Sequence, residues 1–350
     1  MSFYHLTMLM VTILALSWGL TFVIKRFALS QNIIDRPNER SSHQQPTPRG
    51  GGLGFVFIFL TTLFCLIFAG NNFWQYASFF AAGLLVAGIG FADDLSHISA
   101  KWRLLFHGVA AIFILYGIKG MPALGFLAWV LPKGMLADCF AVFFLVWMIN
   151  LYNFMDGIDG LAAIEAISVC VAGALLAVLS GHPTLCFLPL LLAAAVSGFL
   201  YWNFPPACIF MGDCASGFLG LLLGVFALQA AMVNSGLFWA WLIMLGVFIV
   251  DATGTLFVRF VKGLKLTEAH CTHAYQKAGR RHGHLRISLS VLFINLFWLL
   301  PIAFLVVKGY IDGFWGSLIA YLPLMVLLYQ FEAGKKSHSL VENKIKRSYG

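Results

Sequence analysis

Charged side chains are scarce in this 350-residue chain. Asp, Glu, Lys and Arg make up 10% of it and only 14 residues are acidic, whereas about 25% charged residues is usual in soluble domains. Together with a hydrophobic fraction of 61%, this scarcity excludes a soluble globular enzyme and a disordered chain. The seven cysteines include no Cys-x-x-Cys pair, so we expect neither disulfides nor a thiol-rich metal site. The chain has no internal repeat, which excludes a fibrous protein.

Long apolar runs fill the chain instead. A helix that crosses a bilayer needs about 20 apolar residues, and eleven runs of about that length are present. We therefore predict an all-α polytopic integral membrane protein with about 11 transmembrane helices. We expect one transmembrane catalytic domain over residues 1–331 and a basic tail over residues 332–350. The predicted spans are 6–27, 51–70, 75–92, 104–120, 136–152, 160–180, 186–203, 214–233, 237–260, 287–307 and 313–331.

Two apolar stretches need separate interpretation. Residues 121–132 are short and contain Pro122 and Pro132, so we expect an interfacial or re-entrant segment there. The first run resembles a signal peptide in position, but its core is too long and no small-residue cleavage site precedes Lys25. We therefore expect that it stays in the membrane as an anchor.

The basic residues predict the orientation. With a periplasmic N-terminus and eleven spans, all Lys and Arg residues except Lys119, Lys133 and Lys308 fall on the cytoplasmic side. Such an excess follows the positive-inside rule and favours an odd number of spans with a cytoplasmic C-terminus. The predicted cytoplasmic loops are 28–50, 93–103, 153–159, 204–213 and 261–286.

Five aspartates lie where apolar runs meet this same predicted face: Asp93, Asp94, Asp156, Asp159 and Asp213. A carboxylate deep in a bilayer costs about 2.5–3.5 kcal/mol, and less at the end of a span. The orientation rests on Lys and Arg alone, so the shared side of the acids is an independent indication of a functional site there.

The adjacent pair Asp93 and Asp94 ends the third run. Neighbouring carboxylates repel unless a cation neutralises them, and a helix C-terminus disfavours negative charge. We predict a site for Mg²⁺ or a substrate-bound cation; the alternative is two solvated carboxylates. Lys101 and Arg103 open the next run and suit a phosphate-bearing ligand, although Lys101 alone is equally typical of a residue that reaches the interface.

A second polar group follows the fifth run. Asn150, Asn153, Asp156 and Asp159 are spaced by three residues, so on a helix they share a face. Gly157 and Gly160, two glycines within four residues, allow a ligand to approach the backbone closely. The alternative for Asp159 is an N-cap of the next helix, which leaves the two asparagines unexplained.

Further candidates lie in the remaining loops. Asp213 follows a proline-containing segment that begins at Asn203, and we interpret it as a ligand for a hard cation rather than an N-cap. His270 and His273 are followed in the same loop by Arg280, Arg281, His282 and His284. Together they predict a cationic, hydrogen-bonding cover over a diphosphate; a zinc site is the alternative, but the spacing matches no standard pattern. The first loop is rich in Arg, Pro and Gly and is able to wrap a phosphate, or it is simply a solvated turn.

Five of these stretches, in order along the chain, resemble one known family. They are Pro37–His43 with Pro46–Gly52, Asp93-Asp94 with Ser99–His107, Asn153–Ala162, Phe210–Asp213 and Ala269–Gln276. The chain resembles the polyprenyl-phosphate N-acetylhexosamine-1-phosphate transferases of glycosyltransferase family 4. It is most similar to the branch that begins O-antigen or other polysaccharide assembly.

The resemblance implies an enzyme of the bacterial inner membrane with its active site facing the cytoplasm. It would transfer an N-acetylhexosamine-1-phosphate from a UDP-sugar to undecaprenyl phosphate and release UMP. The expected cofactor is Mg²⁺, with Mn²⁺ as a substitute. The expected partners are UDP-N-acetylhexosamine, undecaprenyl phosphate and the bilayer, without nucleic acid; a homodimer is left open. The alternative is a secondary transporter or a subunit of an export system, but the chain lacks mid-span carboxylate clusters and inverted repeats.

The resemblance also implies roles for individual residues. Two departures from the family pattern are Cys214-Ala215-Ser216, which loses a glycine after Asp213, and Cys271, where a basic residue is common. The implied catalytic residues are Asp93, Asp94, Asp156, His270 and His273. The implied substrate-binding residues are Asn38, Arg40, Thr47, Arg49, Lys101, Arg103, Asn150, Asp159 and Asn203, and the implied metal ligands are Asn153 and Asp213.

Overall fold

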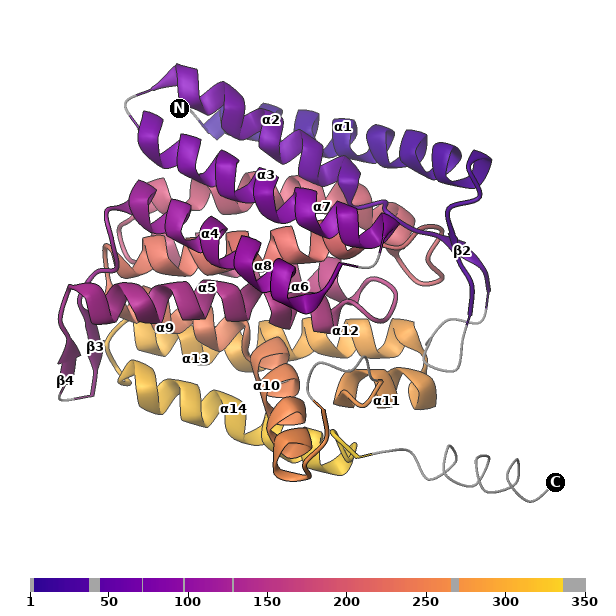
Figure 1. The fold of residues 1–350 in the computed structure, drawn as a ribbon. Helices are drawn as coiled ribbons and strands as arrows, with labels where there is room; N and C mark the ends of the chain where they lie inside the picture. The colour runs from indigo at the N-terminus through magenta and orange to yellow at the C-terminus, as the bar shows by residue number, and fades with distance from the viewer. Residues whose placement is uncertain are drawn as a thin grey trace.

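The computed structural model describes residues 3–37, 45–70, 72–96, 98–127, 129–265 and 271–335 (Figure 1). Its helices form a bundle with largely parallel or antiparallel axes, joined by short connections. The helices are α1 (Phe3–Ser30), α2 (Leu53–Ala69), α3 (Phe73–Leu95), α4 (Ala100–Ile118), α5 (Met135–Met155), α6 (Leu161–Leu179), α7 (Phe187–Asn203), α8 (Asp213–Ala231), α9 (Ser235–Met244), α10 (Gly246–Val261), α11 (Ala274–His282), α12 (His284–Ile294), α13 (Leu300–Val307) and α14 (Gly313–Gln330). A 3₁₀ turn, Pro183–Cys186, precedes α7, and a π-helical segment, Asn295–Leu299, joins α12 to α13.

Every predicted apolar run is helical, so the prediction of an all-α polytopic membrane protein is confirmed. In the described part of the chain, nine helices are long and apolar enough to cross a membrane, and α9 with α10 counts as a tenth. The run at 51–70 forms the 17-residue helix α2, which is shorter than the other spans. The spanning helices are predominantly apolar because the bilayer, like the protein interior, solvates only apolar side chains.

The run at 237–260 is not the continuous span that its composition predicts. It breaks at Leu245, and the axes of α9 and α10 differ by 69°. Figure 1 shows α10 lying across the direction of the bundle. The Tyr321 hydroxyl donates to the carbonyl of Leu242, which is the acceptor that the N–H of Gly246 would use in an unbroken helix. A competing donor of this kind is a recognised cause of helix kinks.

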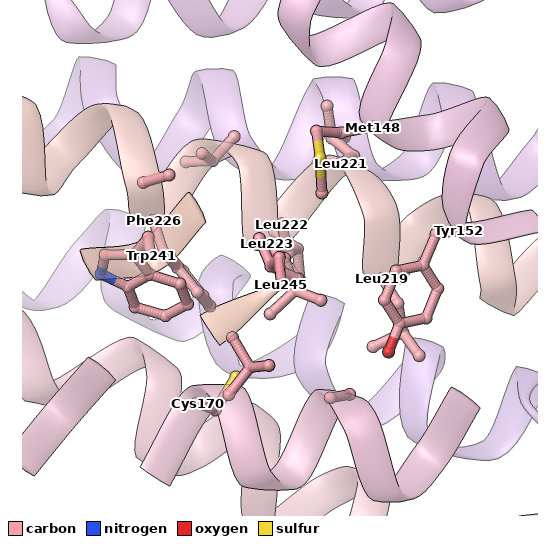
Figure 2. Close-up of a cluster of buried hydrophobic side chains, with 14 of the residues drawn as sticks. Met148, Tyr152, Cys170, Leu219, Leu221, Leu222, Leu223, Phe226, Trp241 and Leu245 are labelled. Carbon is pink, nitrogen blue, oxygen red and sulfur yellow. The ribbon is translucent and has the colours of Figure 1, made fainter. Parts of the chain in front are cut away.

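The helix α8 lies at the centre of the core. Almost all of its residues are buried, as expected for a helix that is apolar on every side. Figure 2 shows Leu219 and Leu222 of this helix among side chains from α5, α6 and α9, including Met148, Cys170 and Trp241. Because neighbours surround α8, the position of its N-terminus, where Asp213 lies, is set by packing.

Residues 121–132 form a hairpin instead of a span. Strands β3 (Leu124–Phe126) and β4 (Trp129–Leu131) pair in antiparallel register, which confirms that this stretch does not cross the membrane. Figure 1 shows the hairpin at one end of the bundle and the second small sheet, β1 (Ile34–Asp35) with β2 (Thr47–Pro48), at the other. The predicted loop 261–286 contains the helix α11, which the periodicity of apolar residues did not reveal.

Candidate active site

The last turn of α3 meets the first turn of α8. Gly90 makes this approach possible, because a Cβ there would lie 2.7 Å from the backbone nitrogen of Cys214. The Asp94 carboxylate accepts the N–H groups of Asp213 at 3.1 Å and Cys214 at 3.2 Å. The free N–H groups and the dipole of a helix N-terminus favour a carboxylate at this position. Gly212 turns the chain into α8 with a φ of +90°, which only glycine adopts without strain.

Two arginines join the three acids of this junction. Arg49 Nη2 lies 2.7 Å from Asp94 Oδ1 and 2.6 Å from Asp213 Oδ1. Arg103 pairs with Asp93, whose other oxygen accepts the N–H of Ile98 at 2.8 Å, and lies 3.8 Å from Asp213. The alternative of two solvated carboxylates at Asp93 and Asp94 is therefore wrong. Asp213 is the most accessible acid, with 29% of its side chain exposed against 6% for Asp93 and 9% for Asp94.

A cavity of about 240 Å³, which we call the acidic cavity, opens beside this junction. Its half-buried Asp156 directly follows α5. Burial raises the pKa of Asp156 to about 7, helped by the nearby carboxylate of Asp213. Such a perturbed carboxyl in a concave site is typical of functional centres. The lining residues are Asp35, Arg49, Asp156, Gly157, Ile158, Asp159, Asn203, Phe210, Met211, Gly212, Asp213, Gln276 and His284.

Asp159 and Asn203 hold the walls of the acidic cavity together. Asp159 accepts the N–H of Ala207 at 3.0 Å and lies 3.3 Å from His284 Nδ1. Asn203 accepts the N–H of Gly160 at 3.0 Å and donates to the carbonyl of Ile209 at 3.0 Å. The N-cap of α6 is Gly160 and that of α8 is Gly212, so the capping alternatives for Asp159 and Asp213 are wrong.

The two asparagines of α5 face a second, small cavity of about 20 Å³. Asn153 donates through Nδ2 to Ser216 at 3.0 Å, so its amide oxygen remains available as a ligand. Asn150 donates to the carbonyl of Val146 on its own helix at 2.7 Å. The small cavity is also lined by Asp93, Arg103 and Asp213, so it adjoins the acidic cavity at Asp213.

A divalent cation fits this arrangement. The carboxylate of Asp213 and the amide oxygen of Asn153 are hard oxygen ligands that line the same small cavity. Among the described residues, no three His, Cys, Asp or Glu side chains form a metal-binding group. Mg²⁺ does not require one, because it keeps several waters and takes only one or two protein oxygens with substrate phosphates. A cavity above about 10–15 Å³ has room for a single water-sized particle.

Other predicted residues lie apart from the cavities. Lys101 is exposed on the first turn of α4 and lines neither cavity. Thr47 is buried in β2, where its hydroxyl donates to the carbonyl of Gln45. Asn38, Arg40 and His270 lie outside the described residues.

His273 takes part in a buried clamp at the start of α11. Its Nδ1 lies 3.2 Å from Asp251, a carboxylate of α10. Asp251 also accepts the N–H groups of Ala274 at 3.0 Å and Tyr275 at 2.8 Å. Tyr275 in turn donates its hydroxyl to the carbonyl of Phe154, two residues before Asp156. His273 therefore helps to position α11 against α5 and α10.

Asp35 and Gln276 line the acidic cavity without a role among the sequence predictions, whereas His284 belongs to the predicted cationic cover. The usual sequence signature of a capping box is absent at Gln276, because the residue three positions earlier is His273 and not Ser, Thr, Asp or Asn. The structure nevertheless contains a capping box between His273 and Gln276. Asp35 and His284 reach the cavity only through tertiary packing.

Comparisons with known proteins identify the family of the chain. The family model described as "Glycosyl transferase family 4" matches residues 76–231. The decaprenyl-phosphate N-acetylglucosaminephosphotransferase of Mycolicibacterium smegmatis is 31% identical over 342 residues, which cover 85% of this chain and 79% of that protein. The phospho-N-acetylmuramoyl-pentapeptide-transferase of Picosynechococcus sp. is 32% identical over 282 residues, 76% of this chain and 74% of that protein.

A third relative extends the similarity over most of the chain. The probable undecaprenyl-phosphate N-acetylglucosaminyl 1-phosphate transferase of Bacillus subtilis is 29% identical over 317 residues, 88% of this chain and 86% of that protein. The matched family segment contains Asp93, Asp94, Asp156 and Asp213. The chain therefore belongs to glycosyltransferase family 4, among the polyprenyl-phosphate N-acetylhexosamine-1-phosphate transferases.

Proposed function

We propose that the protein transfers N-acetylhexosamine-1-phosphate from a UDP-sugar to undecaprenyl phosphate and releases UMP. One observation carries this proposal: Asp94 and Asp213, which lie far apart in the sequence, share Arg49 beside a cavity that also contains Asp156. The names of the relatives from Bacillus and Mycolicibacterium support a polyprenyl phosphate as the acceptor. The product would begin an O-antigen or another cell-surface polysaccharide.

The main task of the site is to bring two anions together. Phosphoryl transfer depends on positioning and on neutralising charge that develops in the transition state. Arg49 and Arg103 reach the junction from two sides, so they are placed to bind phosphate oxygens. Mg²⁺ held by Asp213 and Asn153, or Mn²⁺ in its place, would supply further positive charge at the diphosphate. Asp156, Asp159 and Gln276 line the space left for the nucleotide sugar.

The reaction does not require a strong base. An oxygen of the lipid phosphate attacks the β-phosphorus of the UDP-sugar, and the bond from that phosphorus to the bridging oxygen breaks as UMP leaves. A phosphate monoester has a second pKa of about 6, so the attacking phosphate is largely dianionic at neutral pH. Asp94 already accepts two backbone N–H groups and pairs with Arg49. We infer that Asp94 orients Arg49 and α8 and does not remove a proton.

Release of UMP tests the proposal. The purified protein should release UMP from at least one UDP-N-acetylhexosamine of a panel, only with both undecaprenyl phosphate and Mg²⁺ present. Asp213→Asn should lower kcat at least about 100-fold, since it weakens the proposed Mg²⁺ site and removes the charge that holds Arg49. Asp312→Asn is the matched control, because asparagine keeps the N-cap that Asp312 makes with Phe314 at the start of α14. Release without undecaprenyl phosphate, or none with any UDP-sugar, would contradict the proposal.

We also propose that the acidic end of the bundle faces the cytoplasm of a bacterial inner membrane. The distribution of Lys and Arg supports this orientation. In sealed membrane vesicles, externally added UDP-sugar should yield UMP only when the vesicles are inside out. Equal rates with right-side-out vesicles would contradict the orientation while leaving the chemistry intact.

A further inference from the structure

A second large cavity lies behind α11, and we call it the rear groove. It is formed by α10, α11, α12 and α14 and encloses about 470 Å³, a volume usual for small-molecule sites. Among the described residues, the rear groove and the acidic cavity have no lining residue in common. The helix α11 separates them, because Tyr275 lines the rear groove and its neighbour Gln276 lines the acidic cavity.

The rear groove has a cationic mouth and an apolar interior. His282, in the last turn of α11, and Arg286, in the first turn of α12, are exposed residues of its lining. Along α12 the lining continues through Val291 to Ile294. Eight residues of helix separate Arg286 from Ile294, so the apolar part extends roughly 12 Å from the mouth. Side chains of Leu324, Leu327 and Phe331 from α14 and the segment after it complete the apolar wall.

Among the described residues, the charge at the mouth has no acidic partner. Within the described residues, Arg286 makes no ion pair. Asp251 is the only acidic residue of the described lining, and it is occupied by the N–H groups of Ala274 and Tyr275. The mouth therefore suits an anionic group that is attached to an apolar chain.

We propose that the rear groove binds an anionic glycerophospholipid of the surrounding bilayer, with its phosphate at Arg286 and His282 and an acyl chain along α12. Two other occupants fit less well. The tail at 336–350 carries four Lys or Arg residues and one Glu, so Arg286 would repel it. A polyprenyl phosphate held here would have its phosphate on the far side of α11 from Asp213, where it cannot react.

Such a lipid would hold α11 in place. Tyr275 and Ala278 are the residues of α11 that the lipid would contact. The Tyr275 hydroxyl donates to the carbonyl of Phe154, next to the acidic cavity. A bound lipid thus stabilises the helix that carries Gln276 to the active site. We expect the protein to be more stable with anionic phospholipid than with a zwitterionic one.

Native mass spectrometry and thermal unfolding of the full chain in detergent test this inference. The probes are dioleoyl phosphatidylglycerol and, as the zwitterionic comparison, dioleoyl phosphatidylcholine. Phosphatidylglycerol should stay bound and raise Tm by about 2–4 °C relative to phosphatidylcholine. Arg286→Gln should lower its occupancy about tenfold and remove the shift in Tm, since a charge-assisted bond is lost. Arg286→Lys should retain most of the binding.

The control separates a specific site from general attraction. Arg281→Gln removes the same charge from an exposed residue beside His282 that does not line the rear groove, and it should leave lipid binding and Tm unchanged. Ala278→Phe fills the rear groove from α11 and should exclude the lipid in a protein that still unfolds cooperatively. If Arg281→Gln weakens binding as much as Arg286→Gln, or if undecaprenyl phosphate displaces phosphatidylglycerol from the wild-type protein, the inference is overturned.

Discussion

Replacing Asp94 by asparagine tests whether this residue positions the site or acts as a base. The carboxylate has acceptors on both oxygens and uses them for the N–H groups of Asp213 and Cys214 and for Arg49. The amide of asparagine has one acceptor oxygen and one donor group, so at least one of these donors must face another donor. A hydrogen bond to a charged group contributes about 1.5–3 kcal/mol. We expect Asp94→Asn to lower the free energy of unfolding by about 2–4 kcal/mol.

The kinetic effect of Asp94→Asn follows from the same contacts. Displacement of Arg49 and of the first turn of α8 by about 1 Å is enough to lower kcat about 100-fold. Because the loss arises from misplacement, it should be the same at every pH between about 6 and 9.5. The assay is UMP release at saturating UDP-sugar and undecaprenyl phosphate, with Asp312→Asn as the control. Recovery of Asp94→Asn toward wild-type kcat at high pH would show that Asp94 removes a proton, and the positional role would be refuted.

Three further predictions use other parts of the structure. Arg49→Met leaves Asp94 and Asp213 without their shared cation. It should lower the free energy of unfolding by about 1–3 kcal/mol in EDTA and by less in MgCl₂, where a bound metal ion would replace the missing charge. An equal loss in both solutions would contradict a metal at Asp213. The raised pKa of Asp156, about 7, means that the folded state holds a proton that the unfolded state has already released. In EDTA this group should therefore lower the free energy of unfolding as pH rises from about 4 to about 7, by up to about 1.4 kcal/mol per pH unit. Thermal unfolding of Asp156→Asn should lack this pH dependence. Identical pH profiles for the variant and the wild type would refute the prediction. Glu165 is fully buried in α6 and accepts a hydrogen bond from Asn295 at 2.7 Å. Glu165→Leu should lower Tm, because Asn295 then keeps only its bond to Ser168, whereas Glu165→Gln should stay near wild type. Equal losses in both variants would show that the charge itself is needed.

Much of the fold and part of the site followed from local properties of the chain. A helix that crosses a bilayer must be apolar along its whole length, so each apolar run could be located by counting residues. The pairing of Asp93 with Arg103 was also within reach, because both residues flank one short connection between α3 and α4. Asp94, Asp156 and Asp213 could be placed together because an acid is costly in the bilayer and each lies at the end of a run.

The rest was decided by packing between segments that are distant in sequence. Arg49 reaches Asp213 across 164 positions, and Asp35 and His284 enter the acidic cavity only because their helices and strands converge there. The break at Leu245 depends on a hydroxyl from α14, and the role of His273 depends on Asp251 in α10. Composition and spacing report where a residue lies along the membrane normal, whereas its partners are set by which helices pack side by side, and that information exists only in the tertiary structure.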